Sequence, residues 1–285
     1  MPEKTQKTVV ALSLFVPTNQ SHDVCEVMRG LTKSEPVIIS KPGLKIDKVT
    51  TYLAPDLDVT TIAQRIKDCC PGTYKSQSRV LREEDWMNKW KEHYHAFKLT
   101  SKIRVIPSWE ERKKRSRLID IVLDPGYAFG TGLHETTQFI ARMLQRKRRR
   151  CTSFLDIGFG SGILSIAAAR LGFSAITGID NDPNALAAAG ENIKKNNIET
   201  AITLIKKDLN TYAPVEHVDF IGANLDTTTL LAHRDLLISL MHKESYLCIS
   251  GISTENRKLV HSHYKKKGLR CLKKYIGREW CGYLY

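Results

Sequence analysis

The fold is decided by residues 154–164, which read FLDIGFGSGIL. A hydrophobic strand runs into three glycines at alternate positions, Gly158, Gly160 and Gly162, and then into a helix. Glycine lets bare backbone approach a ligand, and the amino end of a helix suits a negatively charged group. A strand, a glycine turn and a helix in this order are typical of an α/β protein that binds a nucleoside-type cofactor.

The spacing of the glycines argues against a dinucleotide, whose fingerprint needs a third glycine where this chain has Ile163. A second apolar strand, residues 175–180, ends in Asp180, which follows Asp156 by 24 residues. That offset is near the one expected for an acid that binds ribose hydroxyls. Asp182 directly precedes a proline and is the better helix cap, so Asp180 is predicted to be available to a ligand. The alternative is a tight turn that binds nothing.

The pattern of two acids around three glycines resembles the class I S-adenosylmethionine-dependent methyltransferases. In that class the glycines cradle the methionine part of the cofactor and the second acid binds the ribose. The resemblance implies S-adenosylmethionine as cofactor, chemistry without a metal ion, and five contact residues, Asp156, Gly158, Gly160, Gly162 and Asp180.

Composition indicates a soluble protein. At 285 residues the chain is long enough for two domains, and 42% apolar with 26% charged residues is ordinary for a globular protein. No window approaches 18 uninterrupted apolar residues and the first residues lack the apolar core of a signal peptide. We therefore expect a cytoplasmic protein without a membrane segment. The seven cysteines form no Cys-x-x-Cys pattern, which favours reduced thiols over a metal site.

The net charge of +14 is concentrated in four basic runs, at residues 113–117, 146–150, 265–267 and 273–274. Such runs are often no more than solvated faces. The alternative is a polyanionic neighbour, either RNA or a protein bound to RNA. The sequence does not separate these possibilities.

Residues 1–84 are predicted to form a smaller ferredoxin-like α+β domain, because their elements follow the order β-α-β-β-α-β. The expected strands are residues 8–16, 36–40, 48–53 and 74–81, and the expected helices are residues 22–31 and 59–70. Residues 85–123 are predicted to link this domain to the next through a short helix, residues 85–96, and two short strands. Trp86, Trp90 and Tyr94 share one stripe of that helix, which packing alone explains.

Residues 124–285 alternate between helix and apolar strand, which predicts a doubly wound, mostly parallel sheet covered on both faces. The expected strands are residues 152–157, 175–180, 201–206, 217–224, 245–250, 269–276 and 279–285, and the expected helices include residues 161–171, 183–195, 227–241 and 255–267. Only a hairpin fits between the last two strands, so the last strand is predicted to be antiparallel.

Residues 124–137, DPGYAFGTGLHETT, closely resemble the segment before the cofactor fold in the ribosomal protein L11 methyltransferases. The resemblance covers residues 85–285 well, through Asp85-Trp86, Trp90-Lys91, Pro107-Ser108-Trp109, Ala223-Asn224, Ser250-Gly251-Ile252 and Glu279-Trp280-Cys281. The first 80 or so residues match mainly in the order of their elements. The family implies that this first domain recognises the substrate.

Carried over by motif, the cofactor contacts implied by the family are Thr137, Gly158, Asp180 and Asn224, and the residues that shape the lid of the pocket are Thr131, Gly132 and His134. A structural interpretation of the same loop is that Thr131 and Thr136 cap the next helix. Two positions depart from the family. Phe159 stands where a small residue or cysteine is usual, so its ring should point away from the ligand or crowd it, and residues 225–229 are unusually polar.

The resemblance implies a monomeric N-methyltransferase for amines, both lysine side chains and the α-amine, of the eleventh large-subunit ribosomal protein. Asn224 would be the catalytic residue, because it could accept a hydrogen bond from the amine or cofactor without adding negative charge. Its alternative role is that of a turn cap. Two other functions stay open, an RNA methyltransferase and a ribosome-binding protein with a degenerate cofactor site. Residues 1–84 carry no aromatic RNA-recognition signature, which counts against the first.

Overall fold

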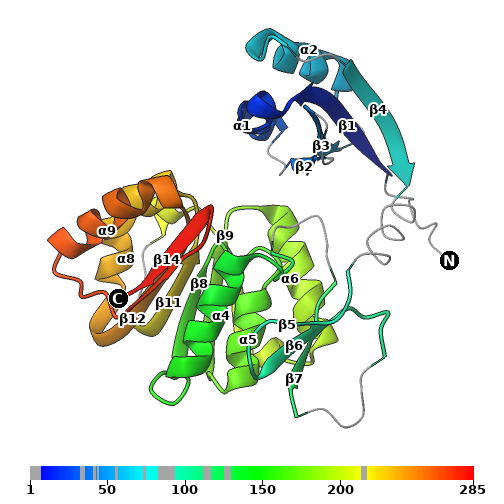
Figure 1. The fold of residues 1–285 in the computed structure, drawn as a ribbon. Helices are drawn as coiled ribbons and strands as arrows, with labels where there is room; N and C mark the ends of the chain where they lie inside the picture. Colours follow the sequence, from blue (N-terminus) through cyan, green and yellow to red (C-terminus); the bar gives the residue numbers. More distant parts are fainter. Residues whose placement is uncertain are drawn as a thin grey trace. The chain divides into compact units, whose positions relative to one another are not determined.

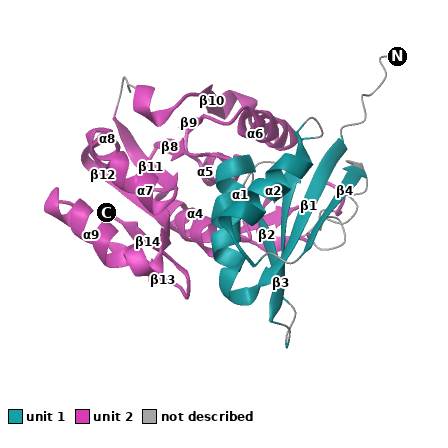
Figure 2. Cartoon of the chain, turned by 90° about the horizontal axis from the view of Figure 1, so that it is seen from above, with its two compact units in different colours: residues 1–93 teal, residues 94–285 magenta. Residues whose placement is uncertain are grey.

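The computed structural model describes residues 8–32, 36–40, 43, 45–54, 57–72, 75–82, 94–111, 117–124, 130–212 and 217–285. The chain divides into two compact units, residues 1–93 and residues 94–285 (Figure 2). Each unit is described by itself.

The first unit is a four-stranded antiparallel sheet with two helices, β1 (Thr8–Pro17), α1 (Ser21–Thr32), β2 (Val37–Ser40), β3 (Ile46–Leu53), α2 (Val59–Cys69) and β4 (Lys75–Arg82). The strand order is β2-β3-β1-β4 and every neighbouring pair is antiparallel. Alternate residues of β1, such as Leu12 and Leu14, are buried with Met28 of α1 and Ile66 of α2. The predicted β-α-β-β-α-β order is confirmed.

The second unit opens with a three-stranded sheet, β5 (Phe97–Lys98), β6 (Ile103–Ile106) and β7 (Ile119–Val122). Most of the helix expected at residues 85–96 lies outside the described residues, Trp86 and Trp90 included. Residues 94–123, assigned to a linker from the sequence, are part of the second compact unit. The functional boundaries at residues 84 and 124 stay predictions.

The main sheet of the second unit has seven strands in the order β10-β9-β8-β11-β12-β14-β13. Its elements are α4 (Glu135–Lys147), β8 (Ser153–Ile157), α5 (Ile163–Leu171), β9 (Ala175–Asp180), α6 (Pro183–Lys195), β10 (Ile202–Lys206), β11 (Val218–Asn224), α7 (Thr227–Ala232), α8 (Arg234–Ser239), β12 (Met241–Ser253), α9 (Arg257–Lys266), β13 (Lys273–Ile276) and β14 (Trp280–Leu284). Strands β8 to β12 pair in parallel, and β14 is antiparallel to both its neighbours. The predicted doubly wound sheet with an antiparallel last strand is confirmed.

Helices cover both faces of this sheet: α5 contacts α4 and α6 on one face, and α7 contacts α8 and α9 on the other (Figure 1). Successive side chains of each strand therefore point to opposite faces of the sheet. Leu155, Ile221 and Tyr283 pack with Val260 and Tyr264 of α9 in the core of the second face.

One predicted helix is wrong. In place of one helix over residues 227–241, residues 227–239 form two short helices that meet at His233, whose backbone leaves the helical region with φ −99° and ψ 11°. The imidazole Nδ1 lies 3.0 Å from the carbonyl oxygen of Thr229, and Nε2 lies 3.2 Å from Asn210 Oδ1. A polar side chain that bonds nearby backbone competes with the helix, and periodicity alone does not reveal this.

Candidate functional site

The glycine turn joins β8 to α5 through left-handed backbone. Gly158 has φ +71° and Gly162, which caps α5, has φ +78°. A Cβ at Gly158 would lie 2.7 Å from Leu225 Cδ2, and one at Gly162 would lie 3.0 Å from the Cβ of Ala189. Both positions therefore favour glycine, because their φ angles are positive and a side chain would have to displace a neighbour.

Asp156 lies below the turn with only 1% of its surface exposed. Its Oδ2 accepts hydrogen bonds from the Ser165 amide at 3.0 Å and from the Ser165 hydroxyl at 2.7 Å. Burial raises the pKa of Asp156 to about 7, against the opposing effect of these two hydrogen bonds. Asp156 thus ties β8 to the first turns of α5, and its direct contact with a cofactor stays a prediction.

Asp180 ends β9 and holds the turn from the other side. Its Oδ2 accepts a hydrogen bond from the Gly160 amide at 2.9 Å, and its Oδ1 accepts one from the Asp182 amide at 3.0 Å. Asp182 caps α6 as predicted, through a 2.8 Å hydrogen bond from the Asn184 amide. A carboxylate oxygen accepts more than one hydrogen bond, so the half-exposed Asp180 is fixed in orientation and retains acceptor capacity for a ligand.

Asn224 ends β11 and lies against the first turn of α4, where its Nδ2 donates to Thr137 Oγ1 at 3.3 Å. Gly251, with φ +87°, follows the neighbouring strand residue Ser250. A Cβ at Gly251 would lie 2.5 Å from the Leu225 carbonyl oxygen and 3.2 Å from Asn224 Oδ1. The glycine therefore leaves Asn224 Oδ1 uncovered on that side.

The loop before α4 packs on the glycine turn. A Cβ at Gly132 would lie 2.3 Å from Ile163 Cδ1, and Ser161 Oγ donates to the Gly130 carbonyl oxygen at 2.5 Å. The Thr131 carbonyl accepts a 2.8 Å hydrogen bond from the buried Tyr94 hydroxyl. Residues 125–129 lie outside the described residues.

His134 is the cap of α4, because its Nδ1 accepts a hydrogen bond from the Thr136 amide at 3.4 Å. The same nitrogen lies 2.7 Å from Thr136 Oγ1, and the imidazole meets the Trp280 ring edge to face at 5.5 Å. The interpretation that Thr131 and Thr136 cap this helix is wrong. Imidazole is a rare cap, so residue type pointed to the threonines.

Phe159 packs its ring into the core. It is buried in a cluster with Ala185 and Ala189 of α6 and with Leu204 of β10. A Cβ at Gly178 would lie 2.9 Å from the Phe159 ring, so the small residue in β9 makes room for the large one. The departure from the family pattern at this position is therefore accommodated by packing.

Sequence reasoning missed the residues that support the site. Asn192, which is buried on α6, donates from Nδ2 to the Ser161 carbonyl at 3.0 Å and accepts from the Asp124 amide at 3.3 Å. Asn196, four residues later, bonds both backbone groups of Val122 at 2.9 and 2.7 Å. Two asparagines at helical spacing on a buried face were the available signal, since buried amides need partners.

The carboxyl ends of β8, β9 and β11 thus bring together Gly158, Gly160, Asp180 and Asn224, each of which is partly exposed. Open α/β sheets bind ligands at this edge. Backbone amides, an oriented carboxylate and a side-chain amide suit a ligand with hydroxyl and other polar groups, so the residues fit a nucleoside-type cofactor.

Two features are absent from the described residues. Within them, no group of three histidine, cysteine, aspartate or glutamate side chains is placed to hold a metal ion. No helix among them has the length and apolar character needed to cross a membrane.

Comparison with known proteins identifies the family. The model of the family described as ribosomal protein L11 methyltransferase (PrmA) matches residues 18–284. The chain is 31% identical to a ribosomal protein L11 methyltransferase of Chloroflexus aurantiacus, over 81% of this chain and 79% of that protein. It is 34% identical to one of Listeria innocua, over 82% and 74%. A crystal structure of ribosomal protein L11 methylase from Lactobacillus delbrueckii subsp. bulgaricus aligns with a TM-score of 0.60 at 30% identity, over 67% of this chain and 97% of that one. This chain therefore belongs to the ribosomal protein L11 methyltransferase family.

Proposed function

We propose that this protein is an S-adenosylmethionine-dependent methyltransferase that modifies amines of ribosomal protein L11. The observation that carries the proposal is the convergence of Gly158, Asp180 and Asn224 at one edge of the sheet, in a chain of this family. The names of its relatives suggest the ribosomal protein as substrate, and the geometry of the strand ends supports a cofactor site there.

The cofactor would be held by the residues at the strand ends. Asp180, already oriented by two amides, would accept hydrogen bonds from the ribose hydroxyls. The backbone of Gly158 and Gly160 would contact the methionine part. When bound, the cofactor supplies a methyl group on a sulfonium that is ready for displacement. The protein's share of the work is to align the donor with the acceptor and to exclude water.

Asn224 is suited to position an amine. Its Nδ2 donates a hydrogen bond to Thr137, so Oδ1 can accept one from an N–H group. Gly251 has no side chain that would cover this oxygen. An amine must be neutral to react, and the reference pKa values are about 10.4 for lysine and about 8 for an α-amine. A neutral acceptor at Oδ1 positions the amine and stabilises its ammonium form less than a carboxylate would.

We assign recruitment of the ribosomal protein to the first unit, because the proposed chemical groups all belong to the second. The protein is proposed to act in the cytoplasm as a monomer. Deletion of residues 1–84 should leave cofactor affinity unchanged and abolish methylation of the protein substrate. A truncated chain that methylates the substrate as fast as the full chain would contradict this assignment.

The cofactor site is tested by calorimetry with S-adenosylmethionine. Asp180→Ala should weaken binding by about 1.5 to 3 kcal/mol, the range for hydrogen bonds to a charged group. The matched control is Asp182→Ala, two residues away, which removes the α6 cap and should cost about 1 kcal/mol of stability with little loss of affinity. Equal affinities for the wild type and Asp180→Ala would overturn the site.

The acceptor is tested by mass spectrometry after incubation with purified ribosomal protein L11 or with naked RNA. Methyl groups should appear on lysine side chains and the α-amine, at a rate that rises from about pH 7 to 9 with the neutral fraction of the amine. Methylation of RNA would support the competing RNA methyltransferase instead. Failure to bind S-adenosylmethionine would support a degenerate site.

A further inference from the structure

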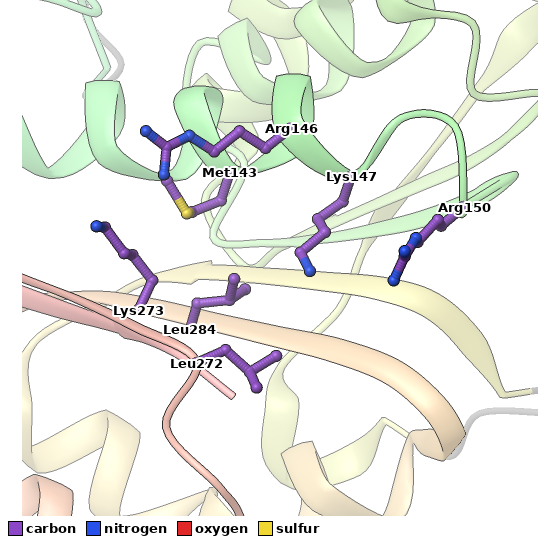
Figure 3. A pocket seen from close by; sticks show the side chains of 7 residues that line it. All are labelled: Met143, Arg146, Lys147, Arg150, Leu272, Lys273 and Leu284. Carbon is purple, nitrogen blue, oxygen red and sulfur yellow. The ribbon is translucent and has the colours of Figure 1, made fainter.

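A cavity of about 380 Å³ opens at the other end of α4, away from the candidate cofactor site (Figure 3). It is lined by Met143, Arg146, Lys147, Arg150, Leu272, Lys273 and Leu284. These residues come from the last turns of α4, from the segment before β8, and from the β13–β14 hairpin. The cavity therefore lies where the parallel strands begin, whereas the glycine turn lies where they end.

Four of the seven lining residues are cations and none is acidic. The ion pairs that the described residues form involve other cations, namely Arg29, Arg104, Lys195, Arg234 and Lys267, or histidines. In Figure 3, Lys273 extends from the hairpin toward Arg146 and Met143, so cations from two elements face one opening. Like charges gathered in this way repel one another unless an anion lies between them.

Stabilisation of the helix dipole explains only part of this cluster. Arg146 and Lys147 occupy the last turn of α4, where cations are favourable, and Arg148 Nη1 donates to the Gln145 carbonyl at 2.7 Å. Arg150 lies beyond the helix and Lys273 belongs to a different element. The dipole gives no reason for these two side chains to line the same cavity.

Tyr246 of β12 lies beside two of the cations. Lys147 Nζ lies 3.9 Å from the centre of the Tyr246 ring, and the nearby positive groups of Arg150 and Lys147 lower the pKa of Tyr246. Side chains held in this way lose less rotational freedom when a ligand binds. The cluster is therefore partly pre-organised.

Apolar side chains form the rest of the lining. Met143 and Leu284 are buried, whereas Leu272 is 48% exposed at the opening. A chain of bare carboxylates would gain nothing from this leucine. A nucleotide combines phosphate charge with a base whose face packs on apolar side chains, and the cavity volume lies within the range of ligand pockets.

We infer that this cavity binds single-stranded RNA, with phosphates on Arg146, Lys147, Arg150 and Lys273 and a base against Leu272. The site is separate from the methyl-transfer site and does not depend on the proposed function. Each phosphate contact releases bound counterions, so the affinity should fall steeply with salt.

The test is fluorescence anisotropy of the full chain with a labelled single-stranded RNA of mixed sequence. Arg150→Glu combined with Lys273→Glu should weaken binding about tenfold or more in 0.1 M salt, and should lower the slope of log K against log salt by about 1.4. The matched control is Lys265→Glu with Lys266→Glu, the same charge change on the exposed end of α9, on the opposite face of the sheet. The control should change affinity less than about twofold.

Equal losses of RNA affinity in the cavity variant and the α9 control variant would overturn the inference, because they would indicate that RNA is attracted by net charge alone. Absence of RNA binding by the wild type would overturn it as well. Far-UV circular dichroism and thermal unfolding check that each variant is folded. If the variant with Arg150→Glu and Lys273→Glu does not fold, the variant with Arg150→Gln and Lys273→Gln replaces it. We expect this variant to lose about fivefold in RNA affinity.

Leu272→Ser distinguishes a nucleotide from a bare phosphate chain. It should weaken RNA binding about threefold or more and leave binding of inorganic polyphosphate unchanged. Unchanged RNA affinity would show that the base makes no contact here, and the proposed ligand would be wrong.

Discussion

The two ends of α4 are built in opposite ways. At its amino end, His134 caps the helix, Thr137 accepts from Asn224, and Glu135 accepts a 2.6 Å hydrogen bond from the Tyr275 hydroxyl. At its carboxyl end, cations line a cavity with no carboxylate among its lining residues. Polar groups that are bonded within the protein fix a geometry, whereas charges left without an opposite charge remain available for a partner. We therefore expect substitutions at the strand ends near the first region to disturb the fold, and substitutions at the second to disturb only binding.

The largest expected effect concerns Asp156, below the glycine turn. Its pKa of about 7 in the folded protein exceeds the value of about 3.9 in the unfolded chain, so between pH 4 and 7 only the folded protein retains this proton. Raising the pH through this window therefore favours unfolding, by up to about 4 kcal/mol. Urea denaturation at several pH values measures the effect, and Asp156→Asn should lack this component. Identical pH profiles for both proteins would contradict the raised pKa.

Gly251→Ala should be the next most damaging change. Its Cβ would lie 2.5 Å from the Leu225 carbonyl oxygen, and φ +87° is unfavourable for alanine. Backbone cannot yield as a flexible side chain does, so we expect a loss of about 2 to 4 kcal/mol in the free energy of unfolding. Cofactor affinity should fall with it, because Asn224 is adjacent.

Gly190→Ala in α6 is the control for Gly251, since a Cβ there would meet nothing within 4 Å. A helical glycine replaced by alanine without a clash should raise stability by roughly 0.5–1 kcal/mol. Stability changes of opposite sign for Gly251→Ala and Gly190→Ala, measured by chemical denaturation, would support tight packing around Gly251 at the carboxyl ends of the parallel strands. A stabilising Gly251→Ala would refute it.

Tyr275→Phe should cost about 1 kcal/mol, because it removes a hydrogen bond to the Glu135 carboxylate at a half-exposed position. That carboxylate raises the pKa of the Tyr275 phenol by accepting its proton in a hydrogen bond. Tyr212→Phe serves for comparison, since the structure records no hydrogen bond of the Tyr212 hydroxyl among the described residues. Thermal unfolding should separate the two variants. Equal midpoints would mean that the Glu135 contact contributes nothing.

The smallest effect is expected at the carboxyl end of α4. Lys273→Gln should change the free energy of unfolding by no more than about 0.5 kcal/mol, because the exposed ammonium has no acidic partner in the cavity. A larger loss would show that this cluster serves the fold, and the contrast between the two ends of α4 would fail.

Much of the fold could be predicted from the sequence because local signals agreed with the tertiary structure. The strands of the first unit lie within two residues of their predicted bounds, and α2 begins directly after Asp58, whose side chain accepts from the amides of Thr60 and Thr61. The glycine turn was recognisable because its positive φ angles favour glycine. Asp180 was recognisable because it is a polar residue at the end of an apolar strand.

The remaining features depend on contacts between distant segments. The ring of Phe159 has room because Gly178 lies beside it, and Asn192 supports the turn through the Ser161 carbonyl. Met143 and Leu284 line one cavity although they lie 141 positions apart in the chain. The basic runs left open both a solvated face and a polyanionic partner, because the order of residues in a run does not tell which side chains converge from two elements.

The β13–β14 hairpin has a consequence for the order of folding. β13 precedes β14 in the chain yet lies outside it in the sheet, and it pairs only with β14. The edge of the sheet therefore cannot grow in the order of synthesis: β12 must wait for β14, and β13 joins the sheet only through β14. Until residues 280–284 emerge, the long strand β12 exposes one side of its backbone. In this interval an unpaired edge strand is open to pairing with another chain.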